Sequence, residues 1–181
     1  MRMSPFLAIP AALTLLIGHA HGETGTGRAQ EYQVKTRYIA SLAEYATWPA
    51  SALPAATSDP IVLGILGTSP LDPYVRELER KHRIHGHRIE AVFLRQPSEA
   101  RRCHIVFVSP SESLRLGEVL QVLRGRPVLT IGDTPGYAAR GVMINLFLTQ
   151  DRVLFEINQN ALKAGGMGIS SHVLKLARIV E

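Results

Sequence analysis

"IVLGILGTSPLDPYVRELERKHRIHGHRIEAVFL", residues 61–94, decides the fold of this chain. Its first seven residues are almost wholly apolar and end in glycine, which is typical of a strand covered on both faces. A helix follows, for which Asp72 is suited as N-cap and Pro73 as first residue. Residues 87–94 then predict a second strand. A strand, a helix and a strand in immediate succession indicate a right-handed crossover between parallel strands.

The next part of the chain continues this alternation. Residues 103–109, "CHIVFVS", predict a third strand, and residues 126–133 predict a fourth. Between them, residues 111–125 predict a helix that Ser111 or Ser113 caps. The order strand–helix–strand–strand–helix–strand favours a mostly parallel sheet with helices on its faces.

The pattern changes in residues 141–158, "GVMINLFLTQDRVLFEIN". Two apolar runs there are joined by Thr149–Arg152, which predicts an antiparallel hairpin. An amphipathic helix is expected before the first strand, with Val34, Tyr38 and Leu42 on its inward face. We therefore expect a single three-layer α/β/α domain over residues 31–181, with a mostly parallel sheet of about six strands that ends in a C-terminal antiparallel hairpin.

The N-terminal 22 residues have the pattern of a signal peptide. Arg2 supplies the positive charge, residues 6–18 the apolar segment, and small residues the cleavage region. The alternative is an uncleaved N-terminal anchor. Residues 23–30, "ETGTGRAQ", are expected to form a flexible leader. The chain is thus expected in the periplasm after cleavage.

The sequence lacks the motifs of common enzymes. No glycine-rich phosphate loop follows a predicted strand, and no G-x-S-x-G nucleophile motif occurs. Ser170 and Ser171 precede a predicted C-terminal helix, so helix capping is favoured over a nucleophilic role. We therefore expect a binding or regulatory protein that is not an enzyme and uses no cofactor.

Histidine and cysteine are the potential metal ligands. Adjacent side chains of a strand point to opposite faces, so Cys103 and His104 are poorly placed to share one ion. His82, His85 and His87 lie around a turn without a carboxylate at ligand spacing. We expect these histidines at the surface and no metal site. Cys103 is the single cysteine, and it is either a buried small hydrophobe or a thiol for an intermolecular bridge.

Glu156 is the residue that folding explains least. It stands between Phe155 and Ile157 in an apolar strand and therefore faces away from both. One interpretation makes Glu156 an outward polar residue of an alternating strand. The other makes it a charged anchor on a surface that meets a partner.

Four blocks of this chain, in order, resemble the YfiR family of periplasmic repressor proteins. They are "EYQVKTRYIASLAEYATWP", "IVLGILGTSPLDPYVREL", "CHIVFVSPSES" and "GVMINLFLTQDRVLFEINQNALKAGGMGISSHVLKLARIV". The resemblance runs from Tyr32 to Ile179. Better-known members carry further cysteines that form disulfides. In this chain the position expected to face Cys103 lies in residues 61–67, which hold no cysteine. A mechanism that depends on such disulfides is therefore not expected here.

The resemblance implies a regulator. Members of the family tend to form homodimers, and the best-known kind binds the periplasmic region of an inner-membrane diguanylate cyclase and holds it inactive. An OmpA-like outer-membrane lipoprotein can sequester the repressor, after which cyclic-di-GMP and biofilm formation rise. A partner of this chain is accordingly expected to be such a cyclase or another membrane sensor, and no nucleic acid is expected.

By the same resemblance, the partner-facing surface comprises the last strand of the hairpin and the segment after it. The residues expected there are Phe155, Glu156, Asn158, Leu162, Ser170, Ser171 and Leu174. Asn158 equally fits a helix cap.

Two other functions remain open. The chain could be a small-ligand sensor whose pocket lies at the strand ends or between Trp48, Tyr38 and the sheet. It could also be an enzyme of a type that the motifs above do not cover.

Overall fold

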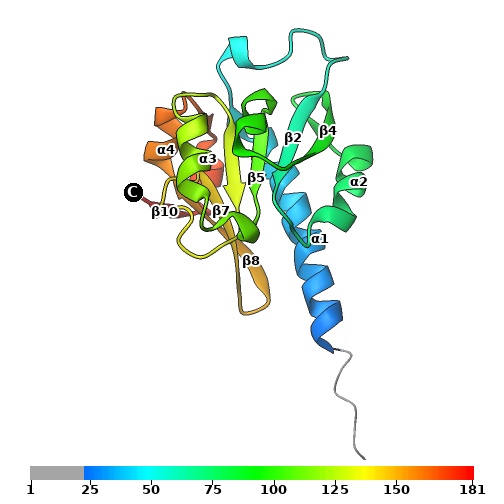
Figure 1. Ribbon diagram of the computed structural model, residues 1–181. Coiled ribbons are helices and arrows are strands. Elements are labelled where there is room, and N and C mark those ends of the chain that lie inside the picture. The colour runs from blue at the N-terminus through cyan, green and yellow to red at the C-terminus, as the bar shows by residue number, and fades with distance from the viewer. Residues whose placement is uncertain (1–22) are drawn as a thin grey trace, which may run out of the picture.

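The computed structural model describes residues 23–181 and shows one central β-sheet with helices on both faces (Figure 1). The helices are α1 (Glu23–Glu44), α2 (Asp72–Lys81), α3 (Leu116–Leu123), α4 (Gln159–Ala164) and α5 (Ser171–Leu174). Short 3-10 turns are η1 (Ala50–Ala52), η2 (Pro97–Arg102) and η3 (Pro110–Glu112). The strands are β1 (Ala46–Thr47), β2 (Ile61–Leu66), β3 (Arg83–Ile84), β4 (His87–Leu94), β5 (Ile105–Val108), β6 (Leu129–Gly132), β7 (Ile144–Thr149), β8 (Arg152–Asn158), β9 (Gly168–Ile169) and β10 (Arg178–Val180).

The main sheet has the strand order β10-β8-β7-β6-β5-β2-β4-β3. Strands β4, β2, β5, β6 and β7 run parallel, and β8 returns antiparallel to β7. The chain moves from β2 to β4 on one side and then crosses back to β5 on the other. Its direction across the sheet therefore reverses between β2 and β5. Ligands in open α/β sheets commonly bind at the carboxyl ends of strands at such a switch point.

Each face of the sheet has its own hydrophobic core. Side chains of alternate strand residues, such as Ile65, Phe107 and Ile131, pack under α1 and α2. The next residues along the same strands, such as Leu66 and Val108, pack under α3 and η2. The alternation explains why these strands are apolar throughout, since both faces are covered. The expected mostly parallel α/β fold is confirmed.

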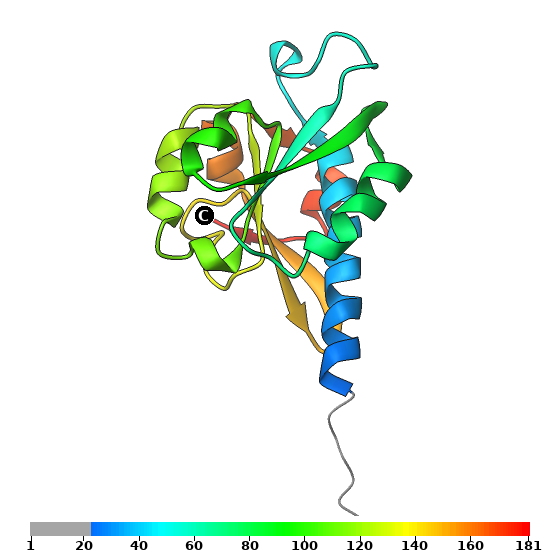
Figure 2. The same ribbon diagram turned by 45° about the vertical axis from the view of Figure 1, so that its right-hand side comes forward.

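Helix α1 is longer than the sequence suggested. It begins at Glu23, so residues 23–30, expected as a flexible leader, are helical and continuous with the rest of α1. Its buried face includes Ile39, Leu42 and Ala43, whereas Tyr45 is 55% exposed. Figure 2 shows the N-terminal half of α1 extending beside the β7–β8 hairpin, past the rest of the domain.

The C-terminal segment differs from the predicted long helix. Only one turn of helix, α5, forms after Ser170, and the chain then enters β10, which pairs in parallel with β8. Arg178 lies opposite Glu156 in that register. With β10 and the short strand β3, the main sheet has eight strands rather than about six. The prediction of a long C-terminal helix failed because the spacing of the leucines is also typical of a helix. The pairing of β10 with β8 is a non-local contact, which a local pattern does not reveal.

The predicted helix caps have mixed outcomes. Asn158 Oδ1 accepts a hydrogen bond from Ala161 N at 2.8 Å, and Ser170 Oγ accepts one from His172 N at 3.3 Å, so both caps are confirmed. Helix α2 already includes Asp72, which shifts its cap to Leu71. Ser111 and Ser113 do not cap α3, because η3 intervenes and Arg115 precedes the helix.

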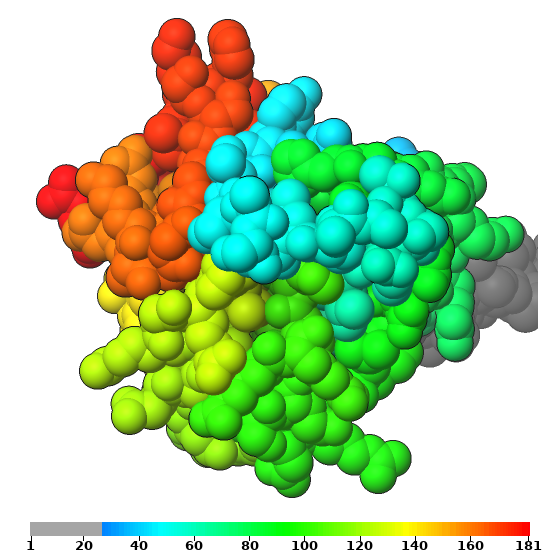
Figure 3. All heavy atoms as spheres, turned by 90° about the horizontal axis from the view of Figure 1, so that it is seen from above, coloured from blue at the N-terminus to red at the C-terminus, as the bar shows by residue number. Residues whose placement is uncertain are grey.

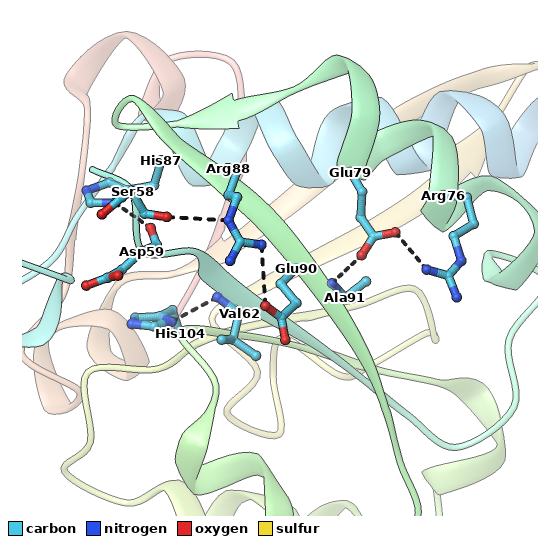
Figure 4. A network of polar contacts seen from close by, with 10 residues as sticks. All are labelled: Ser58, Asp59, Val62, Arg76, Glu79, His87, Arg88, Glu90, Ala91 and His104. Carbon is cyan, nitrogen blue, oxygen red and sulfur yellow. Dashed lines mark hydrogen bonds and ion pairs between the residues drawn. The ribbon is translucent and has the colours of Figure 1, made fainter. Parts of the chain in front are cut away.

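A polar network surrounds the amino ends of the parallel strands (Figure 4). His104 Nδ1 accepts a hydrogen bond from Val62 N at 3.0 Å, and His87 Nδ1 lies 2.9 Å from the Asp59 carbonyl oxygen. His87 is buried, which corrects the expectation of a surface residue. Burial first, and the neighbouring His87 second, lower the pKa of His104. The two histidines thus serve the fold as hydrogen-bonding groups at this end of the sheet.

Candidate functional site

Four of the residues expected at the partner-facing surface are buried. Phe155 packs on Tyr38 with ring centroids 6.0 Å apart, and Leu162 lies in the same core. Glu156 and Asn158 are also almost fully covered, at 7% and 6% exposure. Within this chain, none of these four side chains presents an open surface.

Glu156 faces away from Phe155 and Ile157 as predicted, but its expected exposure is wrong. One carboxylate oxygen accepts a hydrogen bond from Asn145 Nδ2 at 3.1 Å, and the other pairs with the Arg178 guanidinium. The three residues lie opposite one another on β7, β8 and β10. The Arg178 guanidinium also lies 4.6 Å from the ring centroid of Phe147. Glu156 therefore ties the last strand to the sheet, and the sequence around Glu156 could not reveal these partners.

Asn158 has two structural roles. Besides capping α4, it donates a hydrogen bond from Nδ2 to the Ala138 carbonyl oxygen at 2.8 Å. It therefore connects the end of β8 to the loop that follows β6. These bonds account for its side chain without a partner.

The remaining predicted residues lie on a surface at the end of the molecule seen in Figure 3, where the C-terminal segment projects. Ser171 is exposed, and Ser170 and Leu174 are partly exposed. The backbone joins this segment to the end of α1, because Ser170 N donates to Tyr45 O at 3.0 Å and β1 pairs with β9. Tyr45 at 55% and Leu176 at 75% exposure add large apolar groups. We call the residues Tyr45, Ser170, Ser171, Leu174 and Leu176 the C-terminal surface.

Trp48 stabilises the base of this region. Its ring is buried and meets the ring of His85 edge-on, with centroids 5.8 Å apart. His85 Nε2 in turn lies 3.0 Å from the Ala46 carbonyl oxygen. Trp48 is therefore a core residue, and Tyr38 packs partly buried against the same core.

The opposite end of the parallel strands carries unpaired polar groups. Val108 pairs with both Leu66 and Gly132, so the residues that follow them, Gly67, Ser109 and Asp133, stand side by side at the switch point. By strand alternation Ser109 and Asp133 lie on the face under α1. Ser109 is fully buried, as is the side chain of Asp133, yet Ser109 Oγ and Asp133 Oδ1 have no hydrogen-bond partner. Such an atom costs about 1–3 kcal/mol, and native proteins leave few of them.

Helix α1 covers this row with charged and aromatic side chains. Lys35 Nζ lies 3.0 Å from Asp133 Oδ2 and 2.6 Å from Glu31 Oε1, and the Lys35 side chain is 4% exposed. Tyr32 is buried beside them. Burial first, and then the negative charge of Asp133, raise the pKa of Tyr32. Two carboxylates thus share one ammonium group in a covered position.

A groove borders the outer members of this cluster, Glu31 and Tyr32, whereas Lys35, Ser109 and Asp133 do not line it. It has a volume of about 870 Å³ and lies between the N-terminal half of α1 and the β7–β8 hairpin. Glu31 and Tyr32 line its inner side, Leu148 and Val153 its hairpin side, and Arg28 its α1 side. Its size falls in the range of small-molecule sites. A second cavity of about 250 Å³ is also lined by Tyr32, together with Tyr74 of α2.

Cys103 is buried, which confirms one of its two interpretations. Burial raises the pKa of its thiol to about 11. Gly64 of β2 faces it, since a Cβ on Gly64 would lie 2.8 Å from Cys103 Sγ. Strand β2 therefore has a glycine opposite Cys103. The Cys103 thiol occupies the space that a side chain at position 64 would need.

Among residues 23–181, no three histidine, cysteine, aspartate or glutamate side chains are grouped so that they could hold a metal ion. No helix in this part of the chain is long and apolar enough to cross a membrane. The fold is a doubly wound α/β domain with a buried cluster of Lys35, Glu31 and Asp133 at its switch point. By its sequence, the chain belongs to the YfiR/HmsC-like family, whose model matches residues 32–178. The family is periplasmic and regulatory.

Two solved structures share the fold. One is the ABC domain from Streptococcus pneumonia in complex with L-Trp, at a TM-score of 0.55 and 12% sequence identity. The other is a conserved domain protein from Vibrio cholerae, at a TM-score of 0.52 and 11% identity. Each match covers 83% of this chain and 60% of the other chain. At these identities the comparison concerns the fold alone.

Proposed function

We propose that this protein is a periplasmic repressor of an inner-membrane diguanylate cyclase, and that it thereby controls cyclic-di-GMP and biofilm formation. The observation that carries the proposal is the YfiR/HmsC-like family match over residues 32–178. A homodimer is expected for such a repressor, as is sequestration by an OmpA-like outer-membrane lipoprotein.

Repression of this kind is a population shift. The repressor must bind the inactive state of the cyclase more tightly than the active state, because equal affinity would shift nothing. A binding surface outside the membrane suffices for this, since the bound protein only has to bias the arrangement of the sensor region.

We assign the contact to the C-terminal surface. Tyr45 and Leu176 are exposed aromatic and aliphatic side chains, and the Tyr45 carbonyl oxygen accepts a hydrogen bond from Ser170 N. Aromatic residues are enriched among those that dominate binding energy at protein interfaces. The burial of Phe155, Glu156, Asn158 and Leu162 moves the expected contact away from β8 and onto α5.

The test is crosslinking in intact cells followed by affinity capture of the tagged protein from the cell envelope. The expected result is capture of a membrane protein that carries a diguanylate cyclase domain, and a strong decrease in capture with Leu176→Glu. Glu118→Gln, an exposed change on α3, is the matched control and should capture normally. Capture of no membrane signalling protein would contradict the proposal, whereas undiminished capture with Leu176→Glu would contradict only the assigned surface.

A small-ligand sensor is the second candidate, and the buried unpaired oxygens at the strand ends favour it. The related structure from Streptococcus pneumonia holds L-Trp, but that ligand belongs to the other protein. Sensing and repression are compatible, since a ligand can set the population of the binding-competent state.

A further inference from the structure

An arginine-rich surface lies over η2 and α3, on the face of the sheet opposite α1 and α2. Ala100 of η2 packs in one hydrophobic cluster with Leu116 and Val119 of α3, so the two elements lie side by side. No lysine occurs in residues 95–140. The arginines of this stretch, all at least partly exposed, are Arg95, Arg101, Arg102, Arg115, Arg124, Arg126 and Arg140. A guanidinium group matches the geometry of phosphate better than an ammonium group does.

Leu114 projects from this side of the domain and is 100% exposed. Two of the arginines lie next to it, because Arg140 Nη2 donates a hydrogen bond to the Ser113 carbonyl oxygen at 3.1 Å and Arg115 follows Leu114 directly. The turn that carries Leu114 is fixed on both sides. Ser113 Oγ donates to a backbone carbonyl oxygen at 2.6 Å, and Leu116 is fully buried. The exposure of Leu114 is therefore set by an anchored turn.

Polar contacts connect Arg115 to the arginines of η2. Arg115 Nη2 donates a hydrogen bond to Gln96 Oε1 at 3.4 Å. Glu99 Oε2 accepts a hydrogen bond from Arg95 N at 2.8 Å, and Glu99 Oε1 lies 3.7 Å from Arg102 Nη2. The arginines on both sides of Leu114 therefore belong to one continuous surface. We call the residues Arg95, Arg102, Leu114, Arg115 and Arg140 the arginine surface.

Acids do not balance the arginines of this side. The acids of residues 95–140 are Glu99, Glu112, Glu118 and Asp133, and Asp133 pairs with Lys35 on the other face of the sheet. Glu112 is buried, and Glu99 accepts hydrogen bonds from two backbone N–H groups. Within residues 23–181, no ion-pair partner is present for Arg95, Arg101, Arg124, Arg126 and Arg140. Seven arginines and three remaining acids leave an excess of positive charge on this side.

We propose that the arginine surface binds a bilayer that contains anionic phospholipids. The arginines contact lipid phosphate groups, to which a guanidinium group can donate two parallel hydrogen bonds. Leu114 enters the boundary between headgroups and acyl chains, where its side chain is removed from water. A protein partner is disfavoured, because protein interfaces bury an apolar core, whereas here a single leucine stands among arginines.

This inference does not rest on the proposed repressor function, and its test uses no partner protein. The protein tested comprises residues 23–181, because the apolar segment within residues 1–22 would itself associate with lipid. Co-sedimentation is measured with vesicles of phosphatidylcholine alone and with vesicles of phosphatidylcholine and phosphatidylglycerol in equal parts. Binding is expected only to the vesicles with phosphatidylglycerol and should weaken as sodium chloride is added. Equal binding to both kinds of vesicle, or none to either at low ionic strength, would overturn the proposal.

Substitutions at exposed positions test the assigned residues. Leu114→Ser, and the double variant Arg115→Gln with Arg140→Gln, should each lower the partition coefficient on the order of tenfold. The matched control, Arg76→Gln with Arg83→Gln, removes the same charge from exposed positions on α2 and β3 and should bind within about twofold of wild type. Unchanged binding of Leu114→Ser, or equal losses in the two double variants, would contradict the assigned surface.

A fluorophore at position 114 reports insertion directly. Because Cys103 is buried, an environment-sensitive thiol reagent should label only the introduced thiol of Leu114→Cys. Its emission should move to shorter wavelength with the anionic vesicles, whereas the same label on Leu176→Cys should show no change. A change at position 176 without one at position 114 would place the lipid on the C-terminal surface and overturn the proposal. Binding to poly-glutamate as tight as to the vesicles would overturn the assignment to lipid in favour of an acidic polymer.

Discussion

The two ends of the parallel strands use polar side chains differently. At the amino ends, the His104 and His87 rings each hydrogen-bond to a backbone group (Figure 4). At the carboxyl ends, Ser109 Oγ and Asp133 Oδ1 are buried without partners. Polar residues can occupy either end of the strands. The first set therefore serves the fold, whereas the second leaves buried oxygen atoms without partners.

The largest loss of stability is expected when the cluster of Lys35, Glu31 and Asp133 at the carboxyl ends loses its cation, Lys35. Lys35→Met leaves Asp133 buried without its ammonium partner, so the free energy of unfolding should fall by about 3–5 kcal/mol. Urea denaturation at neutral pH measures this change. The double variant Lys35→Met with Asp133→Leu should recover part of the loss, since it removes both charges. Equal losses in the single and double variants would show that packing, and not the unpaired charge, sets the cost.

Glu156 gives the next largest expected effect. Glu156→Lys places a buried cation beside Arg178 and removes the acceptor for Asn145, so unfolding should become easier by about 2–4 kcal/mol. Glu156→Gln keeps an acceptor and should cost less. The measurement is again urea denaturation, with Glu181→Lys at the exposed C-terminus as control. A stability of Glu156→Lys equal to wild type would contradict the role of Glu156 in fixing β10.

Gly64 tests the tight packing beside Cys103. A Cβ at this position would lie 2.6 Å from Leu94 Cδ1 and 2.8 Å from Cys103 Sγ, so Gly64→Ala should destabilise the fold by about 1–3 kcal/mol. Adding Cys103→Ala frees space and should restore part of that loss. Thermal denaturation distinguishes the three variants. Identical melting temperatures of Gly64→Ala with and without Cys103→Ala would mean that the thiol is not the obstacle.

The smallest expected effect is a pH dependence from the amino-end network. Because the pKa of His104 is lowered in the folded state, the unfolded chain binds the proton more readily. Stability should therefore be fully present above the ordinary histidine pKa near 6.5 and should decrease as pH falls below it. His104→Asn should flatten this decrease between about pH 7 and pH 5 in urea denaturation. His172→Asn, at an exposed position, is the control and should follow wild type.

The sequence predicted the parts of the fold that local patterns define. The apolar run of residues 61–67 and the two runs of residues 141–158 became β2 and the β7–β8 hairpin. The C-terminal strand β10 could not be predicted, because its formation depends on pairing with β8 and on the contact between Arg178 and Glu156. For the same reason the burial of Glu156 was missed.

The polar cluster at the carboxyl ends of the strands was predicted only in outline. The alternation of strands and helices indicated a pocket at strand ends, but no local pattern connects Lys35 with Asp133, which are 98 residues apart. The unpaired state of Ser109 Oγ is likewise a property of three-dimensional packing. A polar residue directly after each of two buried strands, Ser109 and Asp133, was the signal that could have located this cluster.

The most direct test of the repressor function is the intracellular cyclic-di-GMP concentration after deletion of the gene. The concentration is expected to rise, to return to its original level when the wild-type gene is restored, and to stay high with Leu176→Glu. Glu118→Gln should restore it as wild type does. An unchanged cyclic-di-GMP concentration in the deletion strain, under conditions in which the protein is present in the parent, would contradict repression of a diguanylate cyclase.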